Sequence, residues 1–77
     1  MALISRFEER PLDPRRIHGE VLCGYGIATV EGRRIIQLET YGSSQRTMPG
    51  KVSQSIQLDE VAARDLKRLL ERAFPGL

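Results

Sequence analysis

The sequence contains few of the residues that most often build catalytic and metal sites. Among its 77 residues there is one cysteine, Cys23, and one histidine, His18. A structural zinc site takes four ligands, and a general base needs a nucleophile or acid within hydrogen-bond reach, which no motif here provides. We therefore expect no metal, no cofactor and no catalytic residue, and we interpret the chain as a binding protein rather than an enzyme.

Two further absences concern the cellular compartment. No apolar run approaches the roughly 20 residues that a membrane-spanning helix requires, and no signal peptide is recognisable at the start of the sequence. The single cysteine cannot form an internal disulfide, as is typical of proteins in a reducing compartment. These features predict a soluble, cytoplasmic protein.

Lysine is also scarce. Lys51 and Lys67 are the two lysines among twelve basic residues, and the others are arginine. Arginine presents a planar fork that suits phosphates and stacks on nucleic-acid bases. A bias in genomic composition would produce the same enrichment, and the net charge of +2 is too small to decide between these explanations.

Hydrophobic periodicity predicts one small α+β domain at residues 17–77, preceded by an arm at 1–16. Pro11 and Pro14 argue against a long helix or a central strand in the arm. Bulky and small side chains then alternate as in a strand, and Glu31-Gly32-Arg33 is a hairpin signal. We expect an antiparallel meander of three to four strands followed by one C-terminal helix. The predicted strands cover 21–30, 34–42 and 51–58, and a short strand or turn is expected at 3–7.

The predicted helix begins after Asp59, whose side chain can cap the first turn, and runs to about Phe74. Apolar residues recur along it at intervals of three and four, which gives one apolar stripe. A domain of this size is marginally stable alone, and more apolar side chains are present than one sheet face can cover. We therefore predict a homodimer whose interface contains Val61, Leu66, Leu69, Leu70 and Phe74.

Regular polar alternation predicts that one face of the sheet is exposed to solvent. That face would carry Gln37, Glu39, Tyr41, Ser53, Ser55 and Gln57. Basic side chains in the neighbouring turns, with an exposed aromatic ring between them, would suit single-stranded nucleic acid. An ordinary solvated sheet face is the alternative interpretation, and the negative charge of Glu39 counts against nucleic acid. The candidate contacts are Arg33, Arg34, Tyr41, Arg46, Lys51 and Gln54.

Residues 34–66 resemble a known family. The strand Ile36-Gln37-Leu38-Glu39-Thr40-Tyr41 is followed by a polar turn with Pro49-Gly50-Lys51, then by Ile56-Gln57-Leu58 and an acidic helix start. This pattern resembles the single-stranded-DNA-binding domain of the positive cofactor 4 family of transcriptional coactivators and its small bacterial relatives. The resemblance implies a four-stranded antiparallel sheet with one helix, dimerisation through the helices, and single strands held across the sheets. It matches Lys51 to the basic residue after Pro-Gly and Tyr41 to an aromatic, with Arg46 in the corresponding loop.

The leading hypothesis is a homodimeric, sequence-tolerant single-stranded nucleic-acid-binding protein, with DNA favoured over RNA, that acts in transcription, repair or defence. The second hypothesis is a small protein-interaction module, such as an accessory or antitoxin-like subunit. It is motivated by the near balance of 12 basic and 10 acidic residues and by the apolar, proline-containing arm.

Overall fold

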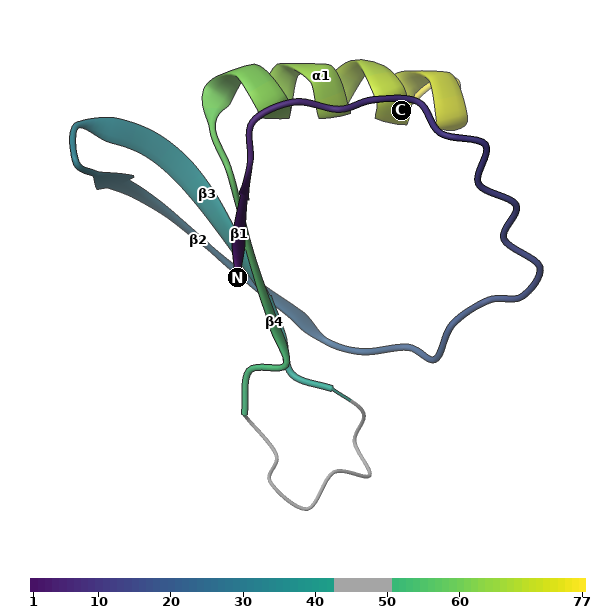
Figure 1. The fold of residues 1–77 in the computed structure, drawn as a ribbon, viewed down its shortest axis with the longest axis horizontal. Coiled ribbons are helices and arrows are strands. Elements are labelled where there is room, and N and C mark those ends of the chain that lie inside the picture. Colours follow the sequence, from purple (N-terminus) through teal and green to yellow (C-terminus); the bar gives the residue numbers. More distant parts are fainter. Residues whose placement is uncertain (43–50) are drawn as a thin grey trace.

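The computed structural model describes residues 1–42 and 51–77, and in these ranges the protein is an α+β chain of four strands and one helix. Figure 1 shows the helix lying across one end of the strands, with a long open segment joining the first strand to the second. The elements are β1 (Ala2–Ile4), β2 (Cys23–Val30), β3 (Arg33–Thr40), β4 (Gln54–Leu58) and α1 (Glu60–Ala73).

The hairpin between β2 and β3 is confirmed. Glu31 and Gly32 form a two-residue turn with φ angles of 52° and 76°. Both values are positive, as a type I′ turn requires, and the twist of that turn matches the twist of paired strands. Val30 therefore pairs directly with Arg33, and the register continues to Cys23 opposite Thr40.

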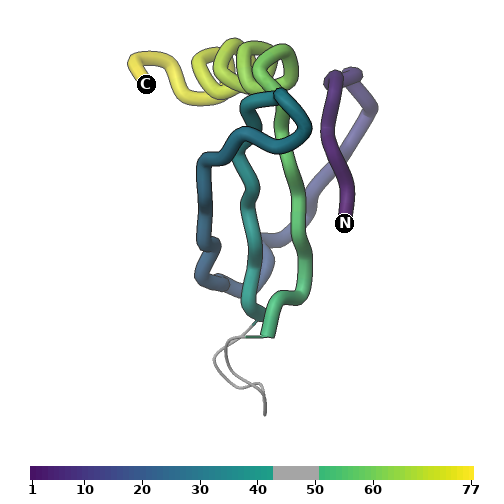
Figure 2. The backbone as a smooth tube through the Cα atoms, turned by 90° about the vertical axis from the view of Figure 1, so that its left-hand side faces the viewer, coloured from purple at the N-terminus to yellow at the C-terminus, as the bar shows by residue number. Residues whose placement is uncertain are grey.

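The predicted meander holds for β2, β3 and β4, but the sheet as a whole is mixed rather than antiparallel. The strand order is β1-β4-β3-β2, and β1 runs parallel to β4 with Ala2 opposite Ile56. Residues 5–22 carry the chain from one edge of the sheet to the other (Figure 2). Connections between strands of the same direction need a dozen or more residues, and this segment is long enough.

The helix begins and ends where the sequence indicated. The Asp59 side chain accepts a hydrogen bond from the backbone N–H of Ala62, with an N···O distance of 2.9 Å. This satisfies one of the unpaired donors in the first turn. At the other end, the Phe74 N–H donates to the Leu70 carbonyl at 2.8 Å, so the helical bonding stops at the expected residue.

The predicted strand boundaries were too generous by two or three residues. β2 begins at Cys23 and β4 at Gln54, whereas their predicted starts were residues 21 and 51. β3 ends at Thr40, and two residues later Gly42 has a φ of 74°, a left-handed conformation that turns the chain out of the sheet. The Ser53 N–H still donates to the Thr40 carbonyl at 2.7 Å, so strand-like contact continues slightly beyond β4.

The interior of the chain is small. Of the apolar residues in the described ranges, three are buried: Ile35, Leu58 and Ala62, at 7%, 4% and 0% exposure. The radius of gyration is 14.6 Å, whereas a compact domain of this length would have about 11.5 Å. The open segment between β1 and β2 extends the chain (Figure 1), and the helix leaves Tyr25 and Ile27 of β2 76% and 59% exposed.

Candidate functional site

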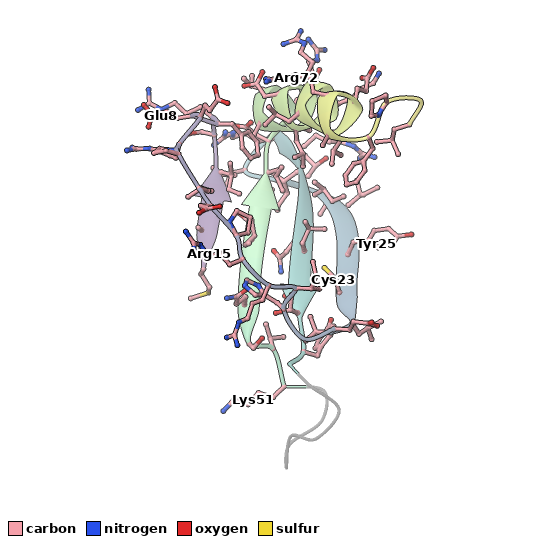
Figure 3. The ribbon with its side chains drawn as sticks, turned by 90° about the vertical axis from the view of Figure 1, so that its right-hand side faces the viewer. Glu8, Arg15, Cys23, Tyr25, Lys51 and Arg72 are labelled. Atoms are coloured by element: carbon pink, nitrogen blue, oxygen red, sulfur yellow. The ribbon has the colours of Figure 1, made fainter. Side chains whose placement is uncertain are left out.

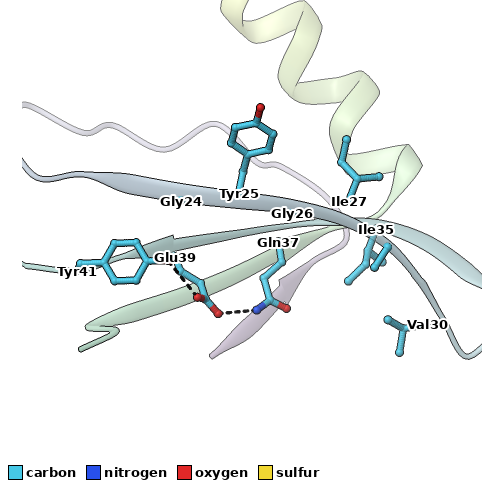
Figure 4. A pocket seen from close by; sticks show the side chains of 10 residues that line it. Gly24, Tyr25, Gly26, Ile27, Val30, Ile35, Gln37, Glu39 and Tyr41 are labelled. Atoms are coloured by element: carbon cyan, nitrogen blue, oxygen red, sulfur yellow. Dashed lines mark hydrogen bonds between the residues drawn. The ribbon is translucent and has the colours of Figure 1, made fainter. Parts of the chain in front are cut away.

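The two faces of the sheet differ sharply in chemistry. Paired residues share a face, so Gln37 lies beside Gln57 and Glu39 beside Ser55. The surface formed by Gln37, Glu39, Tyr41, Ser53, Ser55 and Gln57 is here called the polar face. Figure 4 shows Tyr25 and Ile27 projecting on the other side of the strands, which is the apolar face. The polar face has the composition that strand alternation predicted.

A chain of hydrogen bonds orders the polar face. Gln57 donates from Nε2 to Oε1 of Gln37 at 2.9 Å, and Gln37 donates from Nε2 to Oε2 of Glu39 at 2.6 Å. The Tyr41 hydroxyl approaches the other carboxylate oxygen of Glu39 at 3.4 Å. Each carboxylate oxygen can accept two hydrogen bonds, so Glu39 keeps capacity for a ligand. The side chains of Gln37, Glu39 and Tyr41 form a ridge along β3. Their hydrogen bonds fix the orientation of the Glu39 carboxylate.

A shallow depression lies on one side of this ridge and is here called the glycine trough. Its floor is β2, where Gly24, Gly26 and Ala28 direct little or no side chain toward the polar face. Its volume is about 350 Å³. Figure 4 shows Tyr41, Glu39 and Gln37 lying along the trough. It is therefore a groove with a backbone floor and a hydrogen-bonding wall.

The two glycines in the trough have different surroundings. A Cβ atom at Gly24 would lie 2.6 Å from the Tyr41 hydroxyl oxygen, so the tyrosine depends on glycine there for its position. A Cβ atom at Gly26 would have no heavy atom within 4 Å. Tyr41 thus closely approaches the backbone at Gly24, whereas Gly26 leaves open space.

A second hollow lies on the other side of the ridge. It is lined by Met1 and by Leu3 of β1, by Ser55 and Gln57 of β4, and by Gln37 and Glu39 of the ridge. Both hollows therefore share the same two ridge residues. Apart from Glu39, no side chain that lines these hollows is charged, so the side chains of the polar face offer hydrogen bonds rather than positive charge.

The predicted arginine contacts lie at the hairpin end of the sheet. Arg33 donates from Nη2 to Oδ2 of Asp59 at 3.1 Å, so its guanidinium already holds the carboxylate that caps the helix. Arg34 lies beside Asp59, Glu60 and Ala63 at the start of the helix. Both arginines are thus next to acidic groups, which the sequence pattern did not indicate.

The remaining predicted contacts lie elsewhere. Tyr41 is on the polar face, and Gln54 opens β4 opposite Thr40 at the edge of the second hollow. Lys51 is exposed beyond β4, at the end of the sheet away from the helix (Figure 3). A strand rises about 3.3 Å per residue, so Arg33 and Thr40, at the two ends of β3, are roughly 23 Å apart. Lys51 lies near the Thr40 end. Arg46 lies outside the described residues.

Of the five predicted dimer residues, Leu66 is half-buried and the other four are exposed. Leu66 and Leu70 line an apolar cleft between α1 and the apolar face, together with Ile36, Leu38 and Leu58. Leu69 instead lies beside Phe7 of the arm. Val61 and Phe74 are 63% and 61% exposed. The structure therefore distributes the five predicted residues around the helix rather than in one cleft.

Cys23 is exposed, although a lone cysteine in an alternating strand is more often a small buried hydrophobic residue. It lies at the start of β2, the strand at the edge of the sheet farthest from β1, where α1 does not cover the apolar face (Figure 3). Tyr25 on the same face is 76% exposed for the same reason.

Residues 1–42 and 51–77 contain no group of three or more His, Cys, Asp or Glu side chains placed to hold a metal ion. Within these ranges, the helix is neither long nor apolar enough to cross a membrane. No family model, curated protein or solved structure matches the chain. The resemblance to the positive cofactor 4 family thus remains a prediction.

Proposed function

We propose that this protein is a non-catalytic, homodimeric single-stranded nucleic-acid-binding protein, with DNA favoured over RNA. The observation that carries the proposal is the polar face, where an ordered row of hydrogen-bonding side chains lies beside Tyr41. Single-stranded nucleic acid exposes base edges and ring faces, so amides, hydroxyls and an aromatic ring can all contact it. A cytoplasmic role in transcription, repair or defence fits this activity.

Basic residues at both ends of the sheet support the same proposal. Lys51 lies at one end, and Arg33 and Arg34 lie at the other. Phosphates would bind at these ends while bases occupy the uncharged hollows between them. This division places the negative charge of Glu39 among bases rather than beside phosphates.

The homodimer is supported by the exposed area. The chain has 7205 Å² of accessible surface, whereas a compact monomer of 8.7 kDa has about 4,700 Å². The exposed connection at residues 5–22 contributes to this excess, and so do apolar side chains of the apolar face and the helix, with Tyr25, Ile27 and Phe74 76%, 59% and 61% exposed. A second copy seated on the apolar face would cover the cleft lined by Leu66 and Leu70 while leaving the polar face accessible.

Fluorescence anisotropy of labelled single-stranded and duplex DNA of matched length tests the proposal at low and near-physiological salt. We expect preferential binding of the single strand that weakens steeply with salt. Lys51→Ala should lower affinity and reduce the slope of log affinity against log salt by about 0.7, as expected for one lost phosphate contact. Arg72→Ala is the matched control, because Arg72 lies on the helix away from Lys51 (Figure 3). Absence of binding at low salt would refute the proposal.

A protein-interaction module is the second candidate function. The observation that favours it is the connection between β1 and β2, which includes most of the arm, since residues 5–22 are all exposed and include Leu12, Ile17 and Leu22. Structureless loops longer than about 12–15 residues are uncommon in compact domains and are often functional. A stoichiometric heterologous protein that co-purifies from the native host would favour this candidate, particularly if deletion of residues in the arm released it.

A further inference from the structure

The glycine trough has the shape and the chemistry of a site for one flat ring. Three consecutive polar-face positions of β2 are Gly24, Gly26 and Ala28, so the floor is mostly peptide backbone. Gly26 has open space above it. Because β2 is an edge strand, the trough is open along its outer side. A planar group can therefore enter from that side and lie on the backbone of β2.

The inner wall of the trough offers hydrogen-bonding groups at fixed positions to a planar ring that lies on the floor. Gln37 is paired with Gly26 across the strands, and Glu39 with Gly24. The carboxylate of Glu39 is held by Gln37 at 2.6 Å and approached by Tyr41 at 3.4 Å. A ring above Gly26 would thus have its inner edge beside the Gln37 amide and the carboxylate of Glu39 that Gln37 holds. That carboxylate accepts hydrogen bonds and donates none.

We propose that the glycine trough is a nucleobase subsite that prefers guanine, an inference that rests on the proposed single-strand binding. Guanine carries two adjacent donors, the ring N1–H and the exocyclic 2-amino group, and can donate both to the two oxygens of one carboxylate. The protein would then bind many sequences through its ends and its polar face while favouring strands that place guanine in the trough.

The other bases fit the same wall less well. Adenine and cytosine each present one amino donor next to a ring nitrogen that is an acceptor, and that acceptor would face the Glu39 carboxylate. Thymine presents one donor between two carbonyl acceptors. Specificity arises as much from such unfavourable pairings as from the favourable one. Glu39, which counts against nucleic acid when treated as a bare charge, becomes the specificity-determining residue.

The test compares three labelled oligonucleotides of equal length, about sixteen nucleotides. One contains thymidine throughout, the second has one central deoxyguanosine, and the third has deoxyinosine at that position, which lacks the 2-amino group. A well-formed bidentate contact to a base discriminates by about five- to 150-fold. We expect at least a fivefold gain in affinity for the guanine strand over the thymidine strand, and loss of most of that gain with inosine.

Two variants assign the gain to the trough. Glu39→Gln replaces one acceptor oxygen by a donor, and Gly26→Val fills open space above the floor. Both should bring the ratio of guanine-strand to thymidine-strand affinity close to one. Gly19→Val is the matched control, because Gly19 also has nothing within 4 Å and lies in the connection before β2. It should keep the wild-type ratio.

The outcomes separate the two proposals. Binding of the thymidine strand without a gain from guanine would overturn the guanine subsite and leave single-strand binding intact. A guanine gain that persists in both Glu39→Gln and Gly26→Val would also overturn it, since the preference would then arise elsewhere. No binding of any strand at low salt would overturn both. Circular dichroism of each variant ensures that a lost ratio is not caused by unfolding.

Discussion

The joint between β4 and the helix depends on one carboxylate with two partners. Asp59 accepts from the Ala62 N–H at 2.9 Å and from the Arg33 guanidinium at 3.1 Å. Asp59→Ala removes both contacts, whereas Asp59→Asn keeps an oxygen that can cap the helix and removes only the ion pair. Loss of the cap costs about 1 kcal/mol of unfolding free energy. The ion pair contributes less than about 1 kcal/mol, because the Arg33 side chain is 55% exposed.

We therefore expect Asp59→Ala to lower the free energy of unfolding by about 1–2 kcal/mol, and Asp59→Asn by less than half of that. In a domain of this size the larger loss lowers Tm by about 4–8 °C per kcal/mol. Urea denaturation followed by the helical circular dichroism signal measures both, at one protein concentration because the proposed dimer would link association to folding. Arg33→Gln is the control background, in which Asp59→Asn should have no further effect. Equal losses for Asp59→Asn and Asp59→Ala would refute the assignment of the cap.

Three further outcomes are expected. Leu58→Ala, at a buried core position, should lower the free energy of unfolding by about 2–5 kcal/mol in urea denaturation. Gly24→Ala should lower Tm because its Cβ would meet Tyr41, whereas Gly26→Ala should leave Tm unchanged or raise it; the reverse order would contradict the described packing. Tm of the wild-type protein should rise with protein concentration. The Leu70→Asp variant should lose that dependence and sediment as a monomer. A wild-type Tm that does not depend on concentration would argue against the dimer.

Local signals in the sequence predicted the parts of the fold that depend on local interactions. Asp59 and Phe74 mark the two ends of the helical bonding, because capping and termination use residues within one turn. The hairpin at Glu31 and Gly32 follows from the backbone conformation that its turn demands. The polar face was predicted as well, since strand alternation assigns each side chain to a face without knowledge of the partner strand.

The features that were missed depend on contacts between distant residues. A short strand or turn was expected at residues 3–7, and β1 lies at Ala2–Ile4, but its parallel pairing with β4 was not predicted, because it joins segments more than fifty positions apart. The Arg33–Asp59 ion pair spans 26 residues, so arginine at a hairpin could not be recognised as part of the helix cap. The glycine trough could not be predicted without the register of the strands. Only the pairing of Gly24 with Glu39 and of Gly26 with Gln37 places a backbone floor beside a hydrogen-bonding wall.

The residue alternation of β2 separates the two proposed interactions. Tyr25 and Ile27 project on the apolar face, where a second copy would dock, and Gly24 and Gly26 lie on the polar face, where a base would lie. Because β2 supplies both surfaces, a shift of its register by one residue would move its side chains to the opposite faces of the sheet. The pairing of Gly26 with Gln37 is the register that keeps them in place. Substitutions on the apolar face should therefore affect the dimer, and substitutions in the trough should affect base preference. The free-energy effects of the two sets should add, provided that the strand stays in register.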